Sequence, residues 1–237
     1  MKKIYFSIIL FLFYILLNSL ALLFSFKLYI ENKFPTGASI SFKKGVLLIN
    51  DKNYNLFDLE VAQSYLLVTN IIIVVFFYYY NKNTGTIKSI FNNIDAKKTL
   101  LSIAFFLPFL VFSNFAENLE LFKNDIAFKI SFNNSYVNNA LLFLNVVVLM
   151  PFIEEIIFRA LILEGIIDVF KKKYLAILLS SFLFSLVHIQ YNTSVMILLF
   201  FFSILSSIIY LKFDKNIFYP FIIHAINNFI ATLISNS

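Results

Sequence analysis

Residues 137–170 of the chain read VNNALLFLNVVVLMPFIEEIIFRALILEGIIDVF. The run is apolar enough to cross a bilayer, because a hydrocarbon core of ~30 Å needs about 20 mostly apolar residues in a helix. Near its middle stand two adjacent acids, Glu154 and Glu155, and the only arginine of the chain, Arg159. An ionisable side chain at mid-membrane costs roughly 2.5–3.5 kcal/mol on insertion scales. The segment therefore predicts a membrane helix whose charged groups have a structural or functional purpose.

The composition of the whole chain favours the same environment. Of its 237 residues 60% are hydrophobic and only 14% charged, with a mean hydropathy of +0.85. Soluble domains have about 45–50% apolar and about 25% charged residues. The net charge of +6 does not indicate nucleic-acid binding, because the lysines are scattered between apolar runs. The absence of cysteine excludes disulfide frameworks and thiolate zinc sites. We therefore expect an all-α, polytopic membrane helix bundle.

Seven apolar segments are long enough to be membrane helices, and a split or re-entrant helix within 137–170 would make eight. The first is uncharged over its whole length and exceeds the usual signal-peptide core of about 7–15 residues, so we interpret it as an uncleaved anchor. A signal peptide cleaved near Ser19-Leu20-Ala21 is the alternative. Pro108 lies inside the third segment and predicts a kink. The segments are 4–26, 61–80, 99–116, 137–170, 174–189, 193–211 and 217–235.

The placement of the lysines predicts the orientation of these segments. With a cytoplasmic N-terminus, the short inside loops contain most of the lysines, as the positive-inside rule requires. Seven spans then place the C-terminus outside. The segment between the first two spans, 27–60, is interpreted as a plain extracellular loop in preference to a short hairpin.

The acids of the fourth segment differ in their predicted partners. Glu155 and Arg159 are four residues apart and share one face of a helix, so they can form an ion pair. Glu154 is rotated by ~100° from Glu155 and cannot share that pairing equally. Glu154 is therefore the acid available for proton transfer.

Both histidines of the chain also lie in apolar segments. Counting from the nearest inside lysines, Glu154, His188 and His224 lie at depths of about 25, 22 and 14 Å, close enough to converge in one cavity. His224 and Asn228 share a helix face and can present two donors to one point, as an oxyanion requires. Phe184 is four residues before His188, so its ring can pack beside the imidazole.

Each of these features also has a structural interpretation when taken alone. A buried Glu-Arg pair, a membrane histidine or a membrane asparagine often joins neighbouring helices. No HExxH and no GxSxG sequence is present, which argues against a zincin and against a serine nucleophile. Two Glu, two His and one Asn could hold a divalent metal such as zinc, and they could equally activate water without one.

Three ordered motifs carry a family resemblance. Glu154-Glu155-x-x-x-Arg159, Phe184-x-x-x-His188 and His224-x-x-x-Asn228 resemble the motifs of the CPBP intramembrane proteases, which include CAAX prenyl endopeptidases and bacterial proteins linked to bacteriocin processing and self-immunity. The resemblance divides the chain into N-terminal membrane helices and loops over 1–136 and a protease-like helical core over 137–235.

The resemblance implies a role for each motif residue. Glu154 would be the general base that activates water together with His188, and His224 with Asn228 would form the oxyanion hole. The family has been described as metalloproteases; we favour a metal-free, glutamate-activated water and leave zinc as the alternative. The residues that would structure the site are Glu155, Arg159 and Phe184.

We therefore expect an intramembrane endopeptidase that binds the lipid bilayer and cleaves a peptide or membrane protein, in an oligomeric state that the sequence does not set. The use of Lys over Arg with abundant Ile, Asn and Phe is typical of an AT-rich bacterial genome, which predicts a multi-pass protein of a bacterial plasma membrane. The alternatives are a non-catalytic immunity or scaffold protein and a proton-coupled transporter that uses Glu154 and His188 as a relay.

Overall fold

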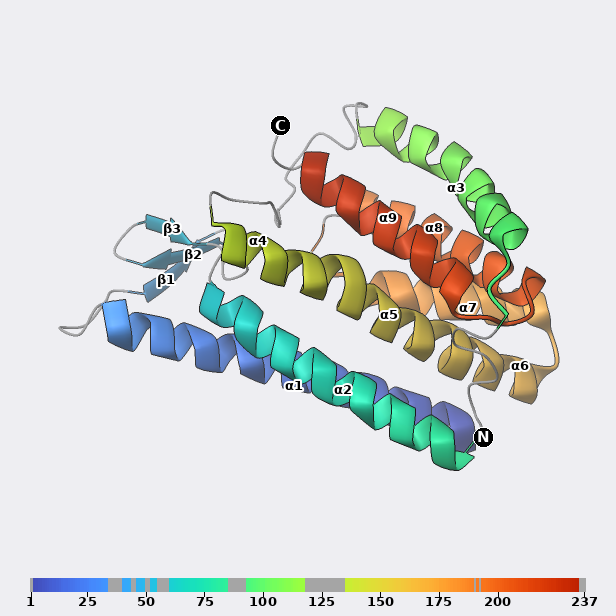
Figure 1. Cartoon of the computed structure of the whole chain (residues 1–237), viewed down its shortest axis with the longest axis horizontal. Helices are drawn as coiled ribbons and strands as arrows, with labels where there is room; N and C mark the ends of the chain where they lie inside the picture. The colour runs from blue at the N-terminus through green and yellow to red at the C-terminus, as the bar shows by residue number, and fades with distance from the viewer. Residues whose placement is uncertain are drawn as a thin grey trace.

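The fold is seen in a computed structural model of the whole chain, which describes residues 2–33, 40–43, 46–49, 52–54, 60–84, 93–117, 135–189, 191 and 193–234. Over this part of the chain, five helices are long and apolar enough to cross a membrane, and two shorter apolar helices complete the bundle (Figure 1). The predicted all-α membrane helix bundle is therefore confirmed. The helices are α1 (Lys2–Lys33), α2 (Glu60–Thr84), α3 (Ala96–Glu117), the continuous helix Tyr136–Phe170, α7 (Lys173–Leu186), α8 (Thr193–Lys212) and α9 (Phe218–Ile234).

The helix Tyr136–Phe170 is uninterrupted over 35 residues, so the split or re-entrant alternative does not apply. At ~1.5 Å per residue it is longer than a ~30 Å bilayer core, so it crosses at a tilt or extends beyond the core. Two π-helical stretches flank a short α segment that ends at Glu155, and such stretches are frequent at functional sites. Its parts are α4 (Tyr136–Leu142), η2 (Phe143–Leu149), α5 (Met150–Glu155), η3 (Ile156–Leu163) and α6 (Glu164–Phe170).

The segment between the first two spans is not the plain loop that the sequence suggested. The first helix extends to Lys33, and three short antiparallel strands follow in the order β1-β2-β3. Ile40 pairs with Ile49 in the first ladder, and Leu47 pairs with Tyr54 in the second. Aliphatic and aromatic residues of this kind favour strands, and the sequence interpretation underrated them. The strands are β1 (Ile40–Lys43), β2 (Val46–Ile49) and β3 (Lys52–Tyr54).

The helices assemble around the long central helix (Figure 1). The pair α1 and α2 packs on one side of it, α7 and α8 pack against η3, α9 packs against η2 and α5, and α3 covers α8 and α9. The start of α1 and the end of α9 lie at opposite ends of the bundle, as expected for seven spans. At the end that holds the start of α1, Lys98 pairs with Asp214 and Lys215 pairs with Glu164. Lys98 and Lys215 therefore lie at the end of the bundle that the sequence analysis predicts to be cytoplasmic.

Buried amides fasten α2 to the central helix. The side-chain nitrogen of Asn145 in η2 donates to Gln63 Oε1 at 2.9 Å and to the Gln63 carbonyl at 2.8 Å. Asn70 Nδ2 donates to Asn145 Oδ1 at 3.2 Å. All three side chains are fully buried. We call Gln63, Asn70 and Asn145 the amide cluster; because its groups are neutral and largely satisfied by one another, it joins helices in lipid at little cost.

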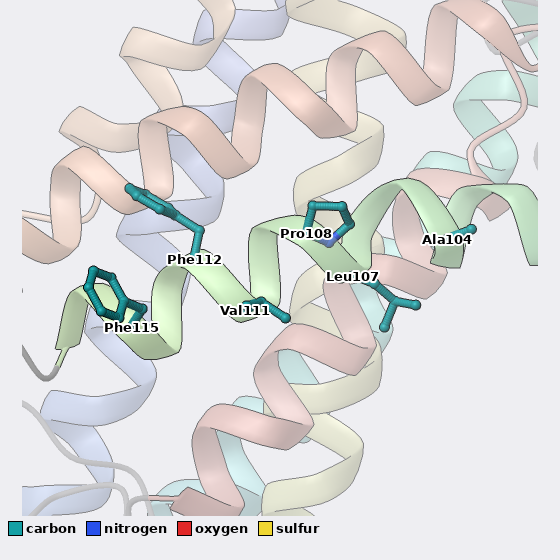
Figure 2. Close-up of a pocket in the computed structure, with 6 residues that line it drawn as sticks. All are labelled: Ala104, Leu107, Pro108, Val111, Phe112 and Phe115. Atoms are coloured by element: carbon teal, nitrogen blue, oxygen red, sulfur yellow. The ribbon is translucent and has the colours of Figure 1, made fainter.

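The outer face of the bundle is apolar, as lipid contact requires. On α3 an open pocket of about 770 Å³ lies beside Pro108, the residue predicted to kink this helix (Figure 2). Several of its side chains are more than half exposed, and no acid, base or amide lines it. It therefore belongs to the lipid-facing surface. Its lining residues are Ala104, Leu107, Pro108, Val111, Phe112 and Phe115.

Candidate active site

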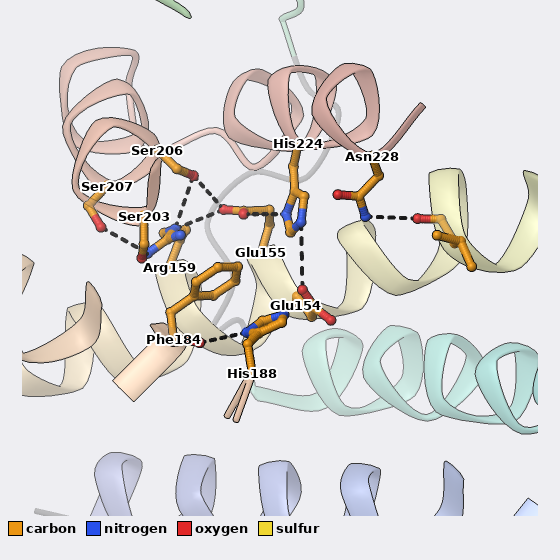
Figure 3. A network of polar contacts seen from close by, with 11 residues as sticks. Glu154, Glu155, Arg159, Phe184, His188, Ser203, Ser206, Ser207, His224 and Asn228 are labelled. Atoms are coloured by element: carbon orange, nitrogen blue, oxygen red, sulfur yellow. Dashed lines mark hydrogen bonds and ion pairs between the residues drawn. The ribbon is translucent and has the colours of Figure 1, made fainter. Parts of the chain in front are cut away.

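The site is built around the Glu155–Arg159 pair expected from the sequence. Arg159 Nε donates to Glu155 Oε2 at 2.8 Å, and both side chains are completely buried (Figure 3). A pair of buried opposite charges is tolerated only when further hydrogen bonds satisfy its remaining atoms. The packing of the face of Phe184 at 5.5 Å from the guanidinium carbon adds a cation–π contact.

Three serines of α8 supply most of those further bonds, and the sequence analysis missed them. Arg159 Nη1 donates to Ser203 at 3.0 Å and to Ser207 at 2.9 Å. Ser206 donates to Glu155 Oε2 at 2.8 Å and accepts from Arg159 Nε at 3.2 Å. The signal was present, because positions 203, 206 and 207 share one face of an otherwise apolar helix. We call these three residues the serine row.

His224 joins the pair to the remaining acid. His224 Nδ1 lies 2.9 Å from Glu155 Oε1, and its Nε2 lies 3.7 Å from Glu154 Oε2 (Figure 3). An ionised carboxylate only accepts hydrogen bonds, so Nδ1 carries a proton and donates it to Glu155. The other ring nitrogen therefore faces Glu154.

Glu154 differs from Glu155 in what it contacts. Its contact with His224 is longer than a hydrogen bond, and its side chain is 17% exposed whereas that of Glu155 is fully buried. No hydrogen bond between Glu154 and Arg159 is formed within the described residues. The acid that helix geometry left over is thus the one whose carboxylate is partly accessible.

His188 lies in the turn that follows α7 and not within a helix. The predicted segment extended to residue 189, whereas α7 ends at Leu186 and the His188 N–H donates to the Ser185 carbonyl at 3.1 Å. His188 Nδ1 donates to the Phe184 carbonyl at 2.7 Å, and the two rings are 4.7 Å apart. Phe184 also contacts His224 at 5.7 Å between ring centroids, so it fills the space between the two histidines.

Asn228 is fixed by the irregular helix opposite it. Its Nδ2 donates to the Val146 carbonyl at 3.0 Å. In the π-helical pattern of η2, Met150 N–H bonds to Asn145, so the next carbonyl would need the N–H of residue 151. That residue is Pro151, which has no N–H, and Asn228 supplies the missing donor. One of the two amide hydrogens of Asn228 therefore has a structural partner, and the second is not used by this bond.

Two tyrosines outside the three motifs also pack in this part of the bundle. The ring of Tyr191 stacks on that of His188 at 6.1 Å, and Tyr14 of α1 is buried beside the central helix. The negative charge of Glu154 acts on the Tyr191 hydroxyl. Burial and this charge raise the pKa of Tyr191 to about 12, so its phenol stays protonated. Sequence spacing gave no signal for either residue.

The donor set does not form an evident metal site. Within the described ranges, no group of three or more His, Cys, Asp or Glu side chains is arranged to hold a metal ion. The Nδ1 atoms of both histidines are engaged, by Glu155 and by the Phe184 carbonyl. The residues that the sequence analysis offered as zinc ligands are therefore not arranged as a three-ligand set in the described part of the chain.

The part of the chain that contains these side chains is similar to a known family. Residues 136–230 match the family model described as Rce1-like, type II CAAX prenyl endopeptidase Rce1-like. The resemblance to the CPBP and CAAX endopeptidases is confirmed. Comparisons with curated proteins and with solved structures found no significant match.

The Rce1-like region contains α4 to α9 with all three motifs, and its match points to a protease of the CAAX type in a multi-pass membrane protein. The helices α1, α2 and α3 lie outside the matched residues. They nevertheless contact the region closely, because Phe11 packs edge-on against Phe158 at 5.2 Å between ring centroids.

Proposed function

We propose that the protein is an intramembrane endopeptidase that uses water activated by Glu154. The observation that carries the proposal is the division of labour between two neighbouring acids. Both carboxylate oxygens of Glu155 are hydrogen-bonded, by Arg159, Ser206 and His224. Glu154 instead has a partly exposed carboxylate that faces His224. A carboxylate without a fixed partner in an apolar bundle is suited to proton transfer.

The reaction follows from the protons that these side chains can hold. Glu154 accepts a proton from a water molecule, and the resulting hydroxide adds to the carbonyl carbon of the scissile peptide bond. His188 Nδ1 donates to a carbonyl, so its Nε2 is free to accept from the same water. When the carbon–nitrogen bond breaks, protonated Glu154 returns its proton to the leaving nitrogen, and the carboxylate is regenerated.

The oxyanion would be stabilised by His224 and Asn228. Because His224 Nδ1 already donates to Glu155, donation to the oxyanion requires a second proton on Nε2. The charges allow this state, since after Glu154 has taken the proton of water, Glu155 and the oxyanion together balance Arg159 and a protonated His224. The unused hydrogen on Asn228 Nδ2 is the second donor.

The substrate we propose is a peptide or membrane protein in the bilayer of a bacterial plasma membrane. CAAX prenyl endopeptidases act on prenylated proteins, which a bacterium is not expected to make. A self-immunity or scaffold protein with the same fold is the competing function.

The test compares the membrane and secreted peptidomes of cells that express wild type or Glu154→Gln at equal levels. A peptide that appears only with wild type is the expected result, and its ends give the cleavage site. Glu164→Gln is a matched control, because Glu164 is a buried acid on the same helix that pairs with Lys215 away from the site. Identical peptidomes together with an intact resistance phenotype in Glu154→Gln would contradict the proposal and favour the immunity function.

A further inference from the structure

The two oxygens of the Glu155 carboxylate have different partners. Its Oε2 accepts from Arg159 Nε and from Ser206, both at 2.8 Å, and its Oε1 is left for His224 Nδ1 at 2.9 Å. An arginine and a carboxylate alone prefer a bidentate pair with two parallel N–H···O bonds. The observed pair is monodentate, so another group must hold it in that state.

The unused donor of Arg159 indicates which other geometry the Arg159–Glu155 pair could adopt. Its Nη2 is buried and has no hydrogen-bond partner among the described residues. In a side-on bidentate pair, Nε and Nη2 bind the two carboxylate oxygens together. If Glu155 turned to satisfy Nη2, its Oε1 would leave His224, and Nδ1 would lose the acceptor that holds its proton.

We propose that Ser206 is a positioning residue that prevents this turn and so keeps the proton of His224 on Nδ1. Ser206 is the member of the serine row that contacts both partners, because it donates to Glu155 Oε2 and accepts from Arg159 Nε. Ser203 and Ser207 contact Nη1 alone. The consequence for catalysis rests on the proposed function, whereas the effect on the proton of His224 does not.

The position of the proton on His224 can be measured directly, because the chain has only two histidines. In a His188→Gln background, His224 is the one source of histidine signals from ¹⁵N-labelled protein in lipid nanodiscs. We expect the ¹⁵N shifts to show a protonated Nδ1. Adding Ser206→Ala is expected to lower the population of that form and to raise the Nε2–H form. Ser203→Ala is the matched control, since Ser207 still holds Nη1, and it is expected to leave the ratio unchanged.

Rescue separates positioning from a general loss of structure. Ser206→Thr keeps a hydroxyl at the same site, so it is expected to restore the Nδ1-protonated form. Circular dichroism and size-exclusion chromatography confirm that each variant is folded. Unchanged His224 signals in folded Ser206→Ala, or equal shifts in Ser206→Ala and Ser203→Ala, would overturn the proposal.

A kinetic measurement links the effect to the reaction, using the His188-containing protein and the peptide found in the peptidome comparison. Loss of a hydrogen bond to a charged group predicts that Ser206→Ala lowers kcat by about tenfold or more, with KM nearly unchanged. A kcat equal to wild type despite altered His224 signals would show that the position of the proton is not needed for the reaction. Absence of cleavage by wild type itself contradicts the proposed function and leaves the spectroscopic result standing.

Discussion

Two clusters of buried polar side chains lie in the same bundle and differ in how their atoms are used. In the amide cluster, Asn145 is held by Gln63 and Asn70 in a neutral network that joins α2 to η2. In the charged cluster, Arg159, Glu155 and the serine row are equally well bonded, but they support a further acid, Glu154, that is not hydrogen-bonded to them.

The comparison shows how to distinguish a structural polar cluster from a reactive one. Both types cost free energy in lipid, and internal hydrogen bonds offset that cost. A cluster that only joins helices directs most of its polar atoms at its own members, and the atom left over here, Asn70 Oδ1, is buried. A cluster built for chemistry leaves one group with an unfilled hydrogen-bonding capacity at an accessible position, and here that group is Glu154.

The largest effect is expected from Glu154→Gln in purified protein. The substitution keeps the shape of the side chain and removes its capacity to accept a proton from water, so cleavage should fall below detection. The thermal unfolding midpoint in nanodiscs should change little, because the contact of Glu154 with His224, at 3.7 Å, is longer than a hydrogen bond. A large loss of thermal stability would place Glu154 with the structural groups and weaken the comparison.

A smaller catalytic loss is expected from Asn228→Ala. Removing one oxyanion donor lowers kcat by about 10²- to 10³-fold in other enzymes. The variant also leaves the Val146 carbonyl without a partner, so an effect on stability should accompany the kinetic one. Asn228→Ser, measured beside it, can keep one donor; equal kcat values for wild type and both variants would remove Asn228 from the site.

The opposite pattern is expected from Asn145→Ala in the amide cluster. The loss of its bonds to Gln63 and Asn70 should lower the free energy of unfolding by about 1–2 kcal/mol, since membrane hydrogen bonds contribute modestly. The kcat of the folded enzyme should stay close to that of wild type. A reversed result, with stability kept and kcat lost, would show that the amide cluster takes part in the reaction.

The smallest effect is expected from metal removal. The described residues contain no three-residue metal cluster, so dialysis against a chelator should leave the cleavage rate unchanged. The control is a chelator-treated sample to which zinc is returned. Loss of activity that zinc restores would assign Glu154, His188 and His224 to a metal and replace the metal-free reaction.

The spacing within one helix predicted part of the site correctly. The four-residue interval between Glu155 and Arg159 gave the ion pair, and the interval between Phe184 and His188 gave the ring contact. The sequence pattern did not predict that α7 ends at Leu186, because the apolar run continues past this residue and no proline or glycine marks the turn. His224 and Asn228 also donate to Glu155 and to the Val146 carbonyl. These acceptors lie on the central helix, so the spacing of the two donors within α9 could not predict them.

The sequence by itself determined the membrane helices, the motifs and which acid is left over by Arg159. These properties depend on hydrophobicity and helical periodicity, which are local. Only the tertiary structure decided that the serine row faces Arg159 and that Asn228 serves the carbonyl left open by Pro151. Each of these depends on how one helix is rotated and shifted against another, and that is set by packing over the whole bundle.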